Sequence, residues 1–268
     1  MSLAARALDH ATALDRLARR DTILGRVDAR AKLIATLGLL FTIASFSPHD
    51  LSRPLPLAIF LAVTLALGQV PLSMVLTRLL VASPFALMVA IWNPVFDTAT
   101  AWQVGTLEVS AGWISFTSVL LRFAFALSAV LVLIATTGFD EVCRAARSLG
   151  APRLFVTQLL LLYRYSFVIA GEVGRMLKAH SLRRPGKRPT LAVARHMLGQ
   201  LLLRALGRAE RIHAAMLCRG FAGVVPVRTG ARFGAGSAVF VVTSLLFFVA
   251  VRGYDWLALA TGDLARTP

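Results

Sequence analysis

The sequence predicts an all-α polytopic membrane protein, with about five transmembrane helices and one large basic segment outside the bilayer. The 268 residues are 57% hydrophobic and only 16% charged, and the mean hydropathy of +0.72 is well above that of soluble domains. The net charge is nevertheless +16. Few charges with so strong a positive bias are typical of a membrane protein whose basic residues are cytoplasmic. The pI near 11.6 would also suit nucleic-acid binding, but the basic residues alternate with long apolar runs, so no nucleic-acid partner is expected.

Residues 1–32 are expected to form a cytoplasmic, amphipathic N-terminus. Between residues 3 and 20, leucines and alanines recur on one helical face, and four arginines lie among the other positions. Such a helix lies along a membrane surface or on a partner. The first long apolar run begins only at Leu33, so no cleavable signal peptide is expected.

A membrane bundle of about four helices is expected over residues 33–137. It opens with two charge-free runs, 33–47 and 55–70. Each is close to the lower limit for crossing a bilayer, which takes roughly 17 to 25 helical residues.

The next two apolar runs each contain a residue that is unusual in a membrane helix. Run 79–92 contains Pro84 and is expected to pack inside the bundle, where neighbouring groups satisfy the carbonyl that the proline leaves free. Run 113–137 is long enough to cross and contains one ion, Arg122. Its side chain either snorkels outward or faces the bundle interior.

Positive-inside counting gives the orientation of the chain. Residues 138–232 contain seventeen Lys and Arg against four acids and are expected to be cytoplasmic, whereas residues 93–112 contain no Lys or Arg and are expected outside. The charge-free run 233–251 is expected to be the final span, which leaves the tail 252–268 outside.

Local composition predicts two features of the basic segment, a helix at the membrane boundary and the state of the two cysteines. The stretch 154–171 is apolar enough to cross, but Arg164 lies at its centre and basic residues flank both ends. A helix at the cytoplasmic boundary is therefore expected, and a helix partly embedded in the membrane is the alternative. Cys143 and Cys218 are both expected to be reduced, small buried side chains.

One pattern occurs twice in the basic segment. Arg175, Ala179 and Arg183 are matched 36 positions later by Arg211, Ala215 and Arg219. Positions i, i+4 and i+8 drift only slowly around one helical face. Each copy therefore predicts a cationic face with a small residue at its middle, which another protein surface can approach closely.

An ion-coupled carrier would require acidic or histidine side chains within its spans. The apolar runs of this chain contain no Asp, Glu or His. The chain has no P-loop and no nucleophile with a plausible neighbouring base. It is expected to be neither a catalyst nor a pump by itself, and to bind no metal or cofactor.

These residues resemble the transmembrane T component of energy-coupling-factor transporters, particularly the CbiQ-like members of cobalt and nickel uptake systems. That family carries Ala-Arg-Gly-type motifs on two cytoplasmic coupling helices, and Cys218-Arg219-Gly220 is close to this pattern. The first copy keeps Arg183 but has Arg184 where the family has glycine. Further similarity lies at Leu24–Leu33, Thr136-Thr137, Leu149–Pro152, Tyr163–Tyr165, and Glu172 with Arg175-Met176.

The resemblance implies a non-catalytic scaffold in the cell (inner) membrane. A dimer of ATP-binding-cassette ATPases would hold the two coupling helices and consume the ATP, and a separate CbiM-like membrane subunit would bind the substrate. The implied coupling residues are Arg175, Ala179, Arg183, Arg184, Arg211, Ala215, Arg219 and Gly220. Cobalt is the first choice of substrate and nickel the second, and a vitamin is not separated from them.

Two alternatives stand beside this interpretation. Arg144-Ala145-Ala146 and Gly150 resemble the coupling loop of a conventional ATP-binding-cassette permease, with Arg144 where that loop has Glu. Alternatively, the basic segment binds anionic membrane lipid in an adaptor that has no transport role.

Overall fold

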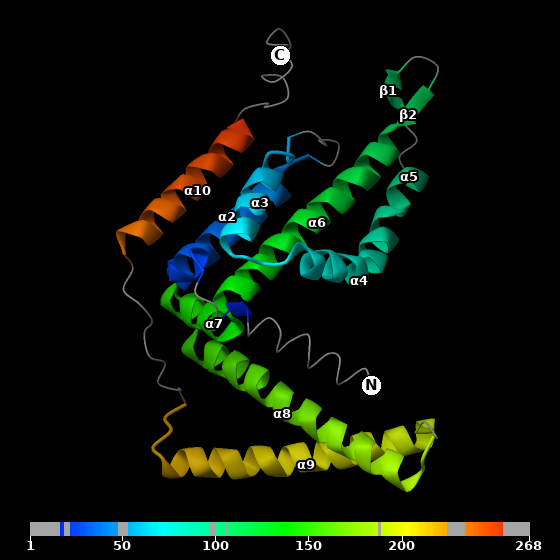
Figure 1. Cartoon of the computed structure of the whole chain (residues 1–268), viewed down its shortest axis with the longest axis vertical. Helices are drawn as coiled ribbons and strands as arrows, with labels where there is room; N and C mark the ends of the chain where they lie inside the picture. Colours follow the sequence, from blue (N-terminus) through cyan, green and yellow to red (C-terminus); the bar gives the residue numbers. More distant parts are fainter. Residues whose placement is uncertain are drawn as a thin grey trace. The chain divides into compact units, whose positions relative to one another are not determined.

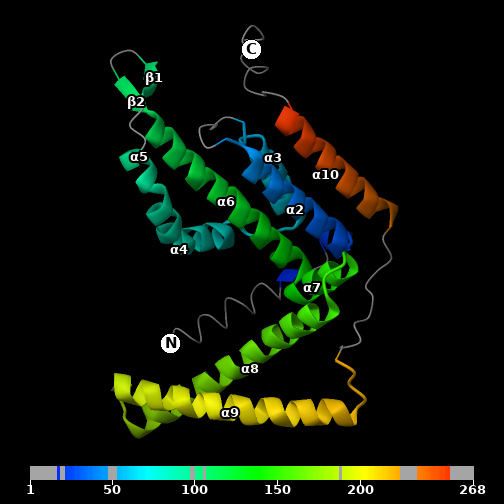
Figure 2. The ribbon, with the colours of Figure 1, turned by 180° about the vertical axis from the view of Figure 1, so that it is seen from behind.

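The computed structural model describes residues 17–18, 22–47, 53–96, 100–104, 107–186, 189–223 and 234–253 (Figures 1 and 2). The helices are η1 (Leu24–Arg26), α2 (Ala29–Ser45), α3 (Leu57–Leu67), α4 (Leu72–Ala90), α5 (Trp92–Phe96), α6 (Ala111–Thr137), α7 (Phe139–Ser148), α8 (Arg153–Arg183), α9 (Leu191–Cys218) and α10 (Ala235–Gly253). The predicted all-α class is confirmed, with one small addition between α5 and α6. This is a two-stranded antiparallel hairpin, β1 (Thr100–Val104) and β2 (Leu107–Ser110).

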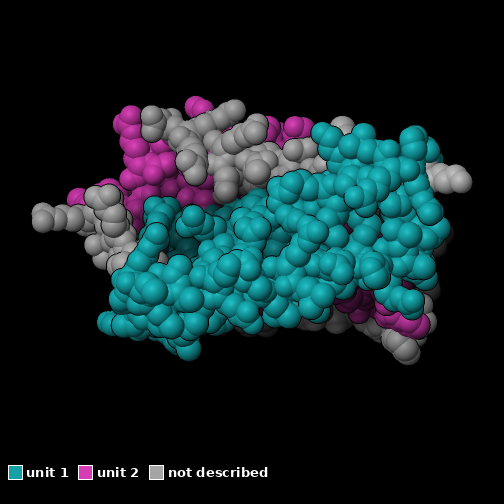
Figure 3. Space-filling model, turned by 90° about the horizontal axis from the view of Figure 1, so that it is seen from below, with its two compact units in different colours: residues 1–16, 139–230 teal, residues 17–138, 231–268 magenta. Residues whose placement is uncertain are grey.

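The chain forms two compact units. Unit 1 comprises residues 1–16 and 139–230 and contains α7, α8 and α9. Unit 2 comprises residues 17–138 and 231–268 and contains the remaining helices; Figure 3 colours the units teal and magenta. The amphipathic helix expected over residues 3–20, apart from Leu17 and Ala18, and the tail beyond Gly253 lie outside the described residues.

Helix α2 begins four residues before the apolar run that predicted it, because Asp28 caps its N-terminus. The Asp28 Oδ1 atom accepts a hydrogen bond from the Arg30 N–H at 2.9 Å. This is the usual role of aspartate at an N-cap. The Asp28 N–H donates to the Ser237 hydroxyl of α10 at 3.0 Å, which fixes the starts of α2 and α10 beside one another.

Polar contacts at the helix ends show how α2, α6 and α10 run. Lys32, only 5% exposed, donates from Nζ to the carbonyl of Thr136 near the end of α6, at 3.1 Å. Ser45, at the end of α2, accepts from Arg252 Nε near the end of α10, at 3.0 Å. Helices α2 and α10 are therefore parallel and α6 is antiparallel to them, and the three lie side by side in Figures 1 and 2.

Arg122 faces the bundle interior, which decides between the two positions considered for it. Its guanidinium donates to the carbonyls of Phe46 (3.1 Å) and Ser47, just beyond the last residue of α2. A helix leaves its last carbonyls without intrahelical partners, and its C-terminal end attracts positive charge. Arg122 satisfies both requirements and so caps α2.

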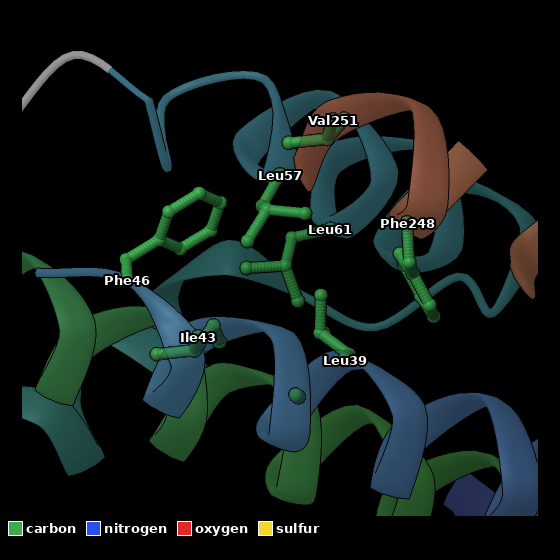
Figure 4. Close-up of a cluster of buried hydrophobic side chains, with 8 residues drawn as sticks. Leu39, Ile43, Phe46, Leu57, Leu61, Phe248 and Val251 are labelled. Carbon is green, nitrogen blue, oxygen red and sulfur yellow. The ribbon is translucent and has the colours of Figure 1, made fainter. Parts of the chain in front are cut away.

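The core of unit 2 lies where α2, α3, α6 and α10 meet. Figure 4 shows side chains from α2, α3 and α10 pointing toward one another. The buried cluster consists of Leu39, Ile43, Phe46, Leu57, Leu61, Ala129, Phe248 and Val251. Gly38 permits the close approach of α2 and α10, since a Cβ there would lie 3.1 Å from Leu245 Cδ2.

Helix α4 differs from its predicted position inside the bundle. It packs along α6, and its other side is open: Leu80, Val81 and Phe85 are 74%, 76% and 71% exposed. Pro84 cannot donate to the carbonyl of Leu80, and the Ser83 hydroxyl donates to that carbonyl instead, at 2.8 Å. The helix therefore satisfies the freed group by itself and needs no surrounding helices for that purpose.

Four helices in the described part are long and apolar enough to cross a membrane, which supports a multi-pass membrane protein. They span Leu72–Pro94, Gly112–Thr137, Arg153–Arg183 and Ala235–Gly253. The set differs from the predicted one. Helix α3, with 11 residues, is only about 16 Å long, since Pro56 and Gly68 bound it, and α8 joins the set by length and composition.

Five hydroxyls within unit 2 are satisfied inside their own helices. Each donates to the carbonyl four residues earlier, at 2.7 to 2.9 Å: Thr36, Thr42, Thr64, Thr136 and Ser244. This back-bonding gives each of the five an acceptor inside its own helix, as the bilayer interior requires. The buried hydroxyls of Ser115 and Thr137 in α6 have no hydrogen-bond partner among the described residues.

Candidate functional site

The repeated arginine pattern lies on the two long helices of unit 1. Helix α8 has 31 residues and follows a turn at Gly150 (φ +104°) and Pro152. The chain then turns back, and α9, with 28 residues, crosses α8 near this turn (Figures 1 and 2). The stretch 154–171 and the first motif thus belong to one continuous helix.

All eight predicted coupling residues are exposed, and each copy of the pattern leads to a helix end. In the first copy, Arg175, Ala179 and Arg183 follow one side of α8 to its last residue. In the second, Arg211 and Ala215 follow one side of α9, and Arg219 is its C-cap. Arg184 and Gly220 come directly after the two motif arginines.

Gly220 ends α9 in a Schellman motif. The Phe221 N–H donates to the Met216 carbonyl and the Gly220 N–H to the Leu217 carbonyl, both at 3.0 Å. Gly220 has φ +77°, a left-handed conformation that glycine adopts without steric cost. The glycine of the second motif therefore has a structural role: it stops the helix directly after Arg219.

The first copy ends differently, at the position where it departs from the family pattern. Arg184 has φ −136°, and its N–H donates to the His180 carbonyl at 2.9 Å. A left-handed glycine follows two residues later, at Gly186 (φ +75°). Helix α8 therefore ends at Arg183 without a glycine in the next position.

The side chains of four motif arginines make no hydrogen bond or ion pair within the part of the chain that the structure describes. These are Arg183, Arg184, Arg211 and Arg219, all of them exposed. Arg183 and Arg219 lie at helix C-termini, which attract positive charge. Their guanidiniums are available for bidentate bonds to carboxylates of another molecule.

Arg175 is the exception among the motif arginines, because it is paired within the chain. Glu172 accepts from Arg175 one turn later and from Arg204 of α9 at 2.6 Å. The second ion pair joins α8 to α9. In the second copy the position equivalent to Glu172 is Arg208, so the charge around Arg211 is reinforced where that around Arg175 is neutralised.

Arg204 and Arg208 are the residues near the motifs that sequence reasoning missed. At about 100° per residue, Arg204, Arg208 and Arg211 fall within about 60° of one another around α9. Their i, i+4 and i+7 spacing was available in the sequence. It was overlooked because only positions repeated in both copies were compared.

An apolar groove of about 600 Å³ lies between the first half of α8 and the second half of α9. Its walls include Leu154, Leu161 and Tyr165 from α8, and Leu206, Ile212 and Met216 from α9. An exposed apolar groove of this kind marks a surface that another subunit or a lipid covers.

The two cysteines differ. Cys143, buried in α7, is a small core side chain as predicted, and burial, reinforced by the Asp140 carboxylate, raises the pKa of its thiol to about 11. Cys218 is exposed, directly before Arg219, so the prediction of burial is wrong for this residue. It lies on the last turn of α9, a helix with no buried residue.

The segment that resembles a permease coupling loop is helix α7 and the turn after it. Arg144, which stands where that loop has Glu, pairs with Glu141 of the same helix at 2.6 Å, and Ala145 is buried. Arg144 is therefore paired within its own helix, although its buried Nε atom has no hydrogen-bond partner among the described residues. Among the described residues, no three His, Cys, Asp or Glu side chains form a group able to hold a metal ion.

The fold and the site together define a helical multi-pass membrane protein with two long helices that end at exposed arginines. A family model described as "CbiQ: Cobalt transport protein" matches residues 20–230. The chain therefore belongs to the CbiQ cobalt transport protein family, which confirms the resemblance found in its sequence. An uncharacterized protein of Methanocaldococcus jannaschii is 28% identical over 226 residues, which cover 79% of this chain and 75% of the relative.

Proposed function

We propose that this chain is the non-catalytic coupling subunit of an ATP-driven energy-coupling-factor importer. It would receive motion from a dimer of ATP-binding-cassette ATPases and pass it to a separate membrane subunit that binds the substrate. The observation that carries the proposal is the pair of helices that end at equivalent, exposed arginines without a partner in the described chain.

The duplication of the motif fits a paired partner. Two ATPase subunits present two equivalent surfaces, and α8 and α9 offer one motif-bearing end to each. Arg183 and Arg219 would bind carboxylates there, while Ala179 and Ala215 would allow the helices to lie close to the ATPase surface. Closure of the ATPase pair around ATP would then move the two helix ends relative to each other.

A transition-metal ion is the proposed substrate, with cobalt first and nickel second. The family description supports cobalt. In this proposal a CbiM-like membrane subunit binds the ion, and the apolar groove between α8 and α9 supplies a surface on which a helix of that subunit packs. ATP is consumed by the ATPase partners.

The double variant Arg183→Glu with Arg219→Glu tests the coupling role. Each charge-assisted contact contributes about 1.5–3 kcal/mol, so losing both weakens ATPase attachment by a hundredfold or more, and uptake of radioactive cobalt is abolished. Copurification with the ATPase and uptake in the same cells measure both effects. Full transport by this variant would overturn the proposal.

A matched control keeps the total charge change but moves it elsewhere on the same helices. Arg153→Glu with Arg195→Glu alters two exposed arginines near the starts of α8 and α9, and uptake is expected to continue.

Arg183→Lys with Arg219→Lys separates coupling from lipid attraction. It preserves charge but not bidentate geometry, so coupling falls and vesicle binding does not. If neither fell, the lipid-binding adaptor, which depends on total charge alone, would be favoured.

A further inference from the structure

A second hollow between α8 and α9 adjoins the apolar groove. Its volume is about 430 Å³. Ile169, Ala205 and Arg208 line both the hollow and the groove. Its remaining walls are of two kinds. One is apolar, with Val168 and Leu203, and the other carries charged side chains.

The charged wall of the hollow is strongly cationic. Arg204, Arg208 and Arg211 line it together with a single carboxylate, Glu172. Glu172 is already bonded to Arg204 and Arg175. Arg208 and Arg211 have no hydrogen bond or ion pair elsewhere among the described residues. The hollow therefore holds positive charge that none of the described residues balances.

The apolar wall coincides with a change in the character of α8. From residue 154 to residue 171 the only charge is Arg164, and the polar half of the helix begins at Glu172. Val168 and Ile169 are in the last turn of the apolar half. A ligand that fills the hollow thus meets hydrocarbon on one side and guanidiniums on the other.

We propose that this hollow binds an anionic phospholipid, with the phosphate on Arg204, Arg208 and Arg211 and the first part of an acyl chain on Val168, Ile169 and Leu203. A free phosphate would leave the apolar wall uncovered, and an uncharged lipid would leave the arginines unbalanced. Basic hollows between helices of membrane proteins are suited to anionic headgroups. The lipid would hold α8 and α9 together at their crossing, independently of ATPase docking.

The test uses the full-length chain in nanodiscs of phosphatidylcholine with a minor fraction of phosphatidylglycerol. After mild extraction, native mass spectrometry counts the phosphatidylglycerol retained per chain. Each arginine near an anionic surface contributes about a factor of five, so Arg204→Gln with Arg208→Gln lowers the affinity roughly thirtyfold. The control Arg153→Gln with Arg195→Gln removes the same charge outside the hollow and retains the lipid.

Glu172→Gln distinguishes an effect of charge on lipid retention from an effect of the lost ion pair. Removal of the negative charge is expected to raise retention, whereas loosening of the two helices would lower it. The substitution breaks the ion pair between α8 and α9 but removes the only negative charge in the hollow, so retention rises by roughly fivefold. Lower retention in Glu172→Gln, or equal loss in the double variant and its control, would overturn the proposal. The proposal would also be overturned if soluble glycerol phosphate, at the same concentration as the phosphatidylglycerol, displaced the lipid. Retained lipid with lost ATPase attachment in Arg204→Gln/Arg208→Gln would assign the arginines to a protein partner's carboxylate instead.

Discussion

Gly220 determines where the second motif ends. Its φ of +77° costs an L side chain about 1–2 kcal/mol, and the two bonds that close α9 depend on that conformation. Gly220→Ala is therefore expected to loosen the last turn and raise the hydrogen-exchange rates of the Gly220 and Phe221 amides at least fivefold. ATPase attachment should weaken as well, because Arg219 loses its fixed position.

Gly199→Ala is the matched control for this substitution. Gly199 lies within α9, and a Cβ there meets no atom within 4 Å. Alanine in a helix interior is better than glycine by about 1 kcal/mol, so this variant should protect α9 slightly. If both variants had the same effect on exchange at Gly220, the closing turn would not depend on the left-handed residue.

The two cysteines provide a test that needs no mutation. With a pKa raised to about 11, the Cys143 thiol is roughly one part in a thousand thiolate at pH 8, and it is buried as well. Maleimide is therefore expected to label Cys218 alone, and labelling of Cys143 should increase only as the pH approaches 11. Peptide mass spectrometry identifies the modified residue.

The same labelling reports on partner binding, because Cys218 is adjacent to Arg219. When the ATPase is bound, Cys218 should react several times more slowly than in the isolated chain. Unchanged reactivity in the intact complex would mean that the second motif does not lie in the ATPase interface.

The residue scale also shows what sequence alone leaves open. Composition identified Arg122 as the one ion of its run, but its direction depends on where α2 ends, which is a tertiary fact. Cys218 was misplaced for a related reason. Apolar neighbours such as Met216 and Leu217 predict burial, whereas α9 contains no buried residue.

At the scale of the element, Ser83 explains how α4 continues through Pro84. Without the Ser83 hydroxyl the Leu80 carbonyl would have no donor, at a cost of about 1–3 kcal/mol. Ser83→Ala is therefore expected to lower the thermal unfolding midpoint in detergent by a few degrees. Adding Pro84→Ala should restore it, because alanine at residue 84 supplies the missing N–H.

Thr77→Ala controls for the loss of a hydroxyl from the same helix. Thr77 donates to the Ser73 carbonyl at 2.7 Å, but that carbonyl also accepts the backbone N–H of residue 77. Its loss should change the midpoint little. A destabilised Ser83→Ala/Pro84→Ala double variant would show that the hydroxyl acts in some other way.

The ends of a helix were predicted well where the helix coincides with an apolar run. The prediction was wrong where a capping residue determines the end of the helix. Run 233–251 corresponds closely to α10, and run 113–137 to α6. By contrast, Asp28 starts α2 early, and Pro56 and Gly68 shorten α3, although all three residues are visible in the sequence. Helix α8 joins an apolar run to a charged motif, which hydropathy alone divides into two segments.

At the scale of the whole molecule, helix direction limits the possible orientations in the membrane. Contacts at one level join the ends of α2 and α10 to Arg122 of α6, and contacts at the other join Asp28 to Ser237 and Lys32 to Thr136. Residues 45 and 253 are therefore on one side and residue 137 is on the opposite side. Residues 138–232, with seventeen basic residues, follow residue 137 directly, so the positive-inside rule predicts that this side is cytoplasmic.

Reporter fusions and labelling test this orientation. Alkaline phosphatase, active only outside the cytoplasm, is expected to be active when fused after Gly253 and inactive when fused after Gly150.

Both ends of α8 should lie in the cytoplasm if Arg164 and the flanking cations keep it from crossing. In a background with Cys143→Ser and Cys218→Ser, Arg153→Cys and Ser181→Cys should both react with an impermeant maleimide in inside-out vesicles only. Labelling of the two positions from opposite sides would show that α8 crosses the bilayer. The two motif arginines could not then both reach ATPases in the cytosol, because Arg183 would lie outside with Ser181 whether or not α9 crossed back.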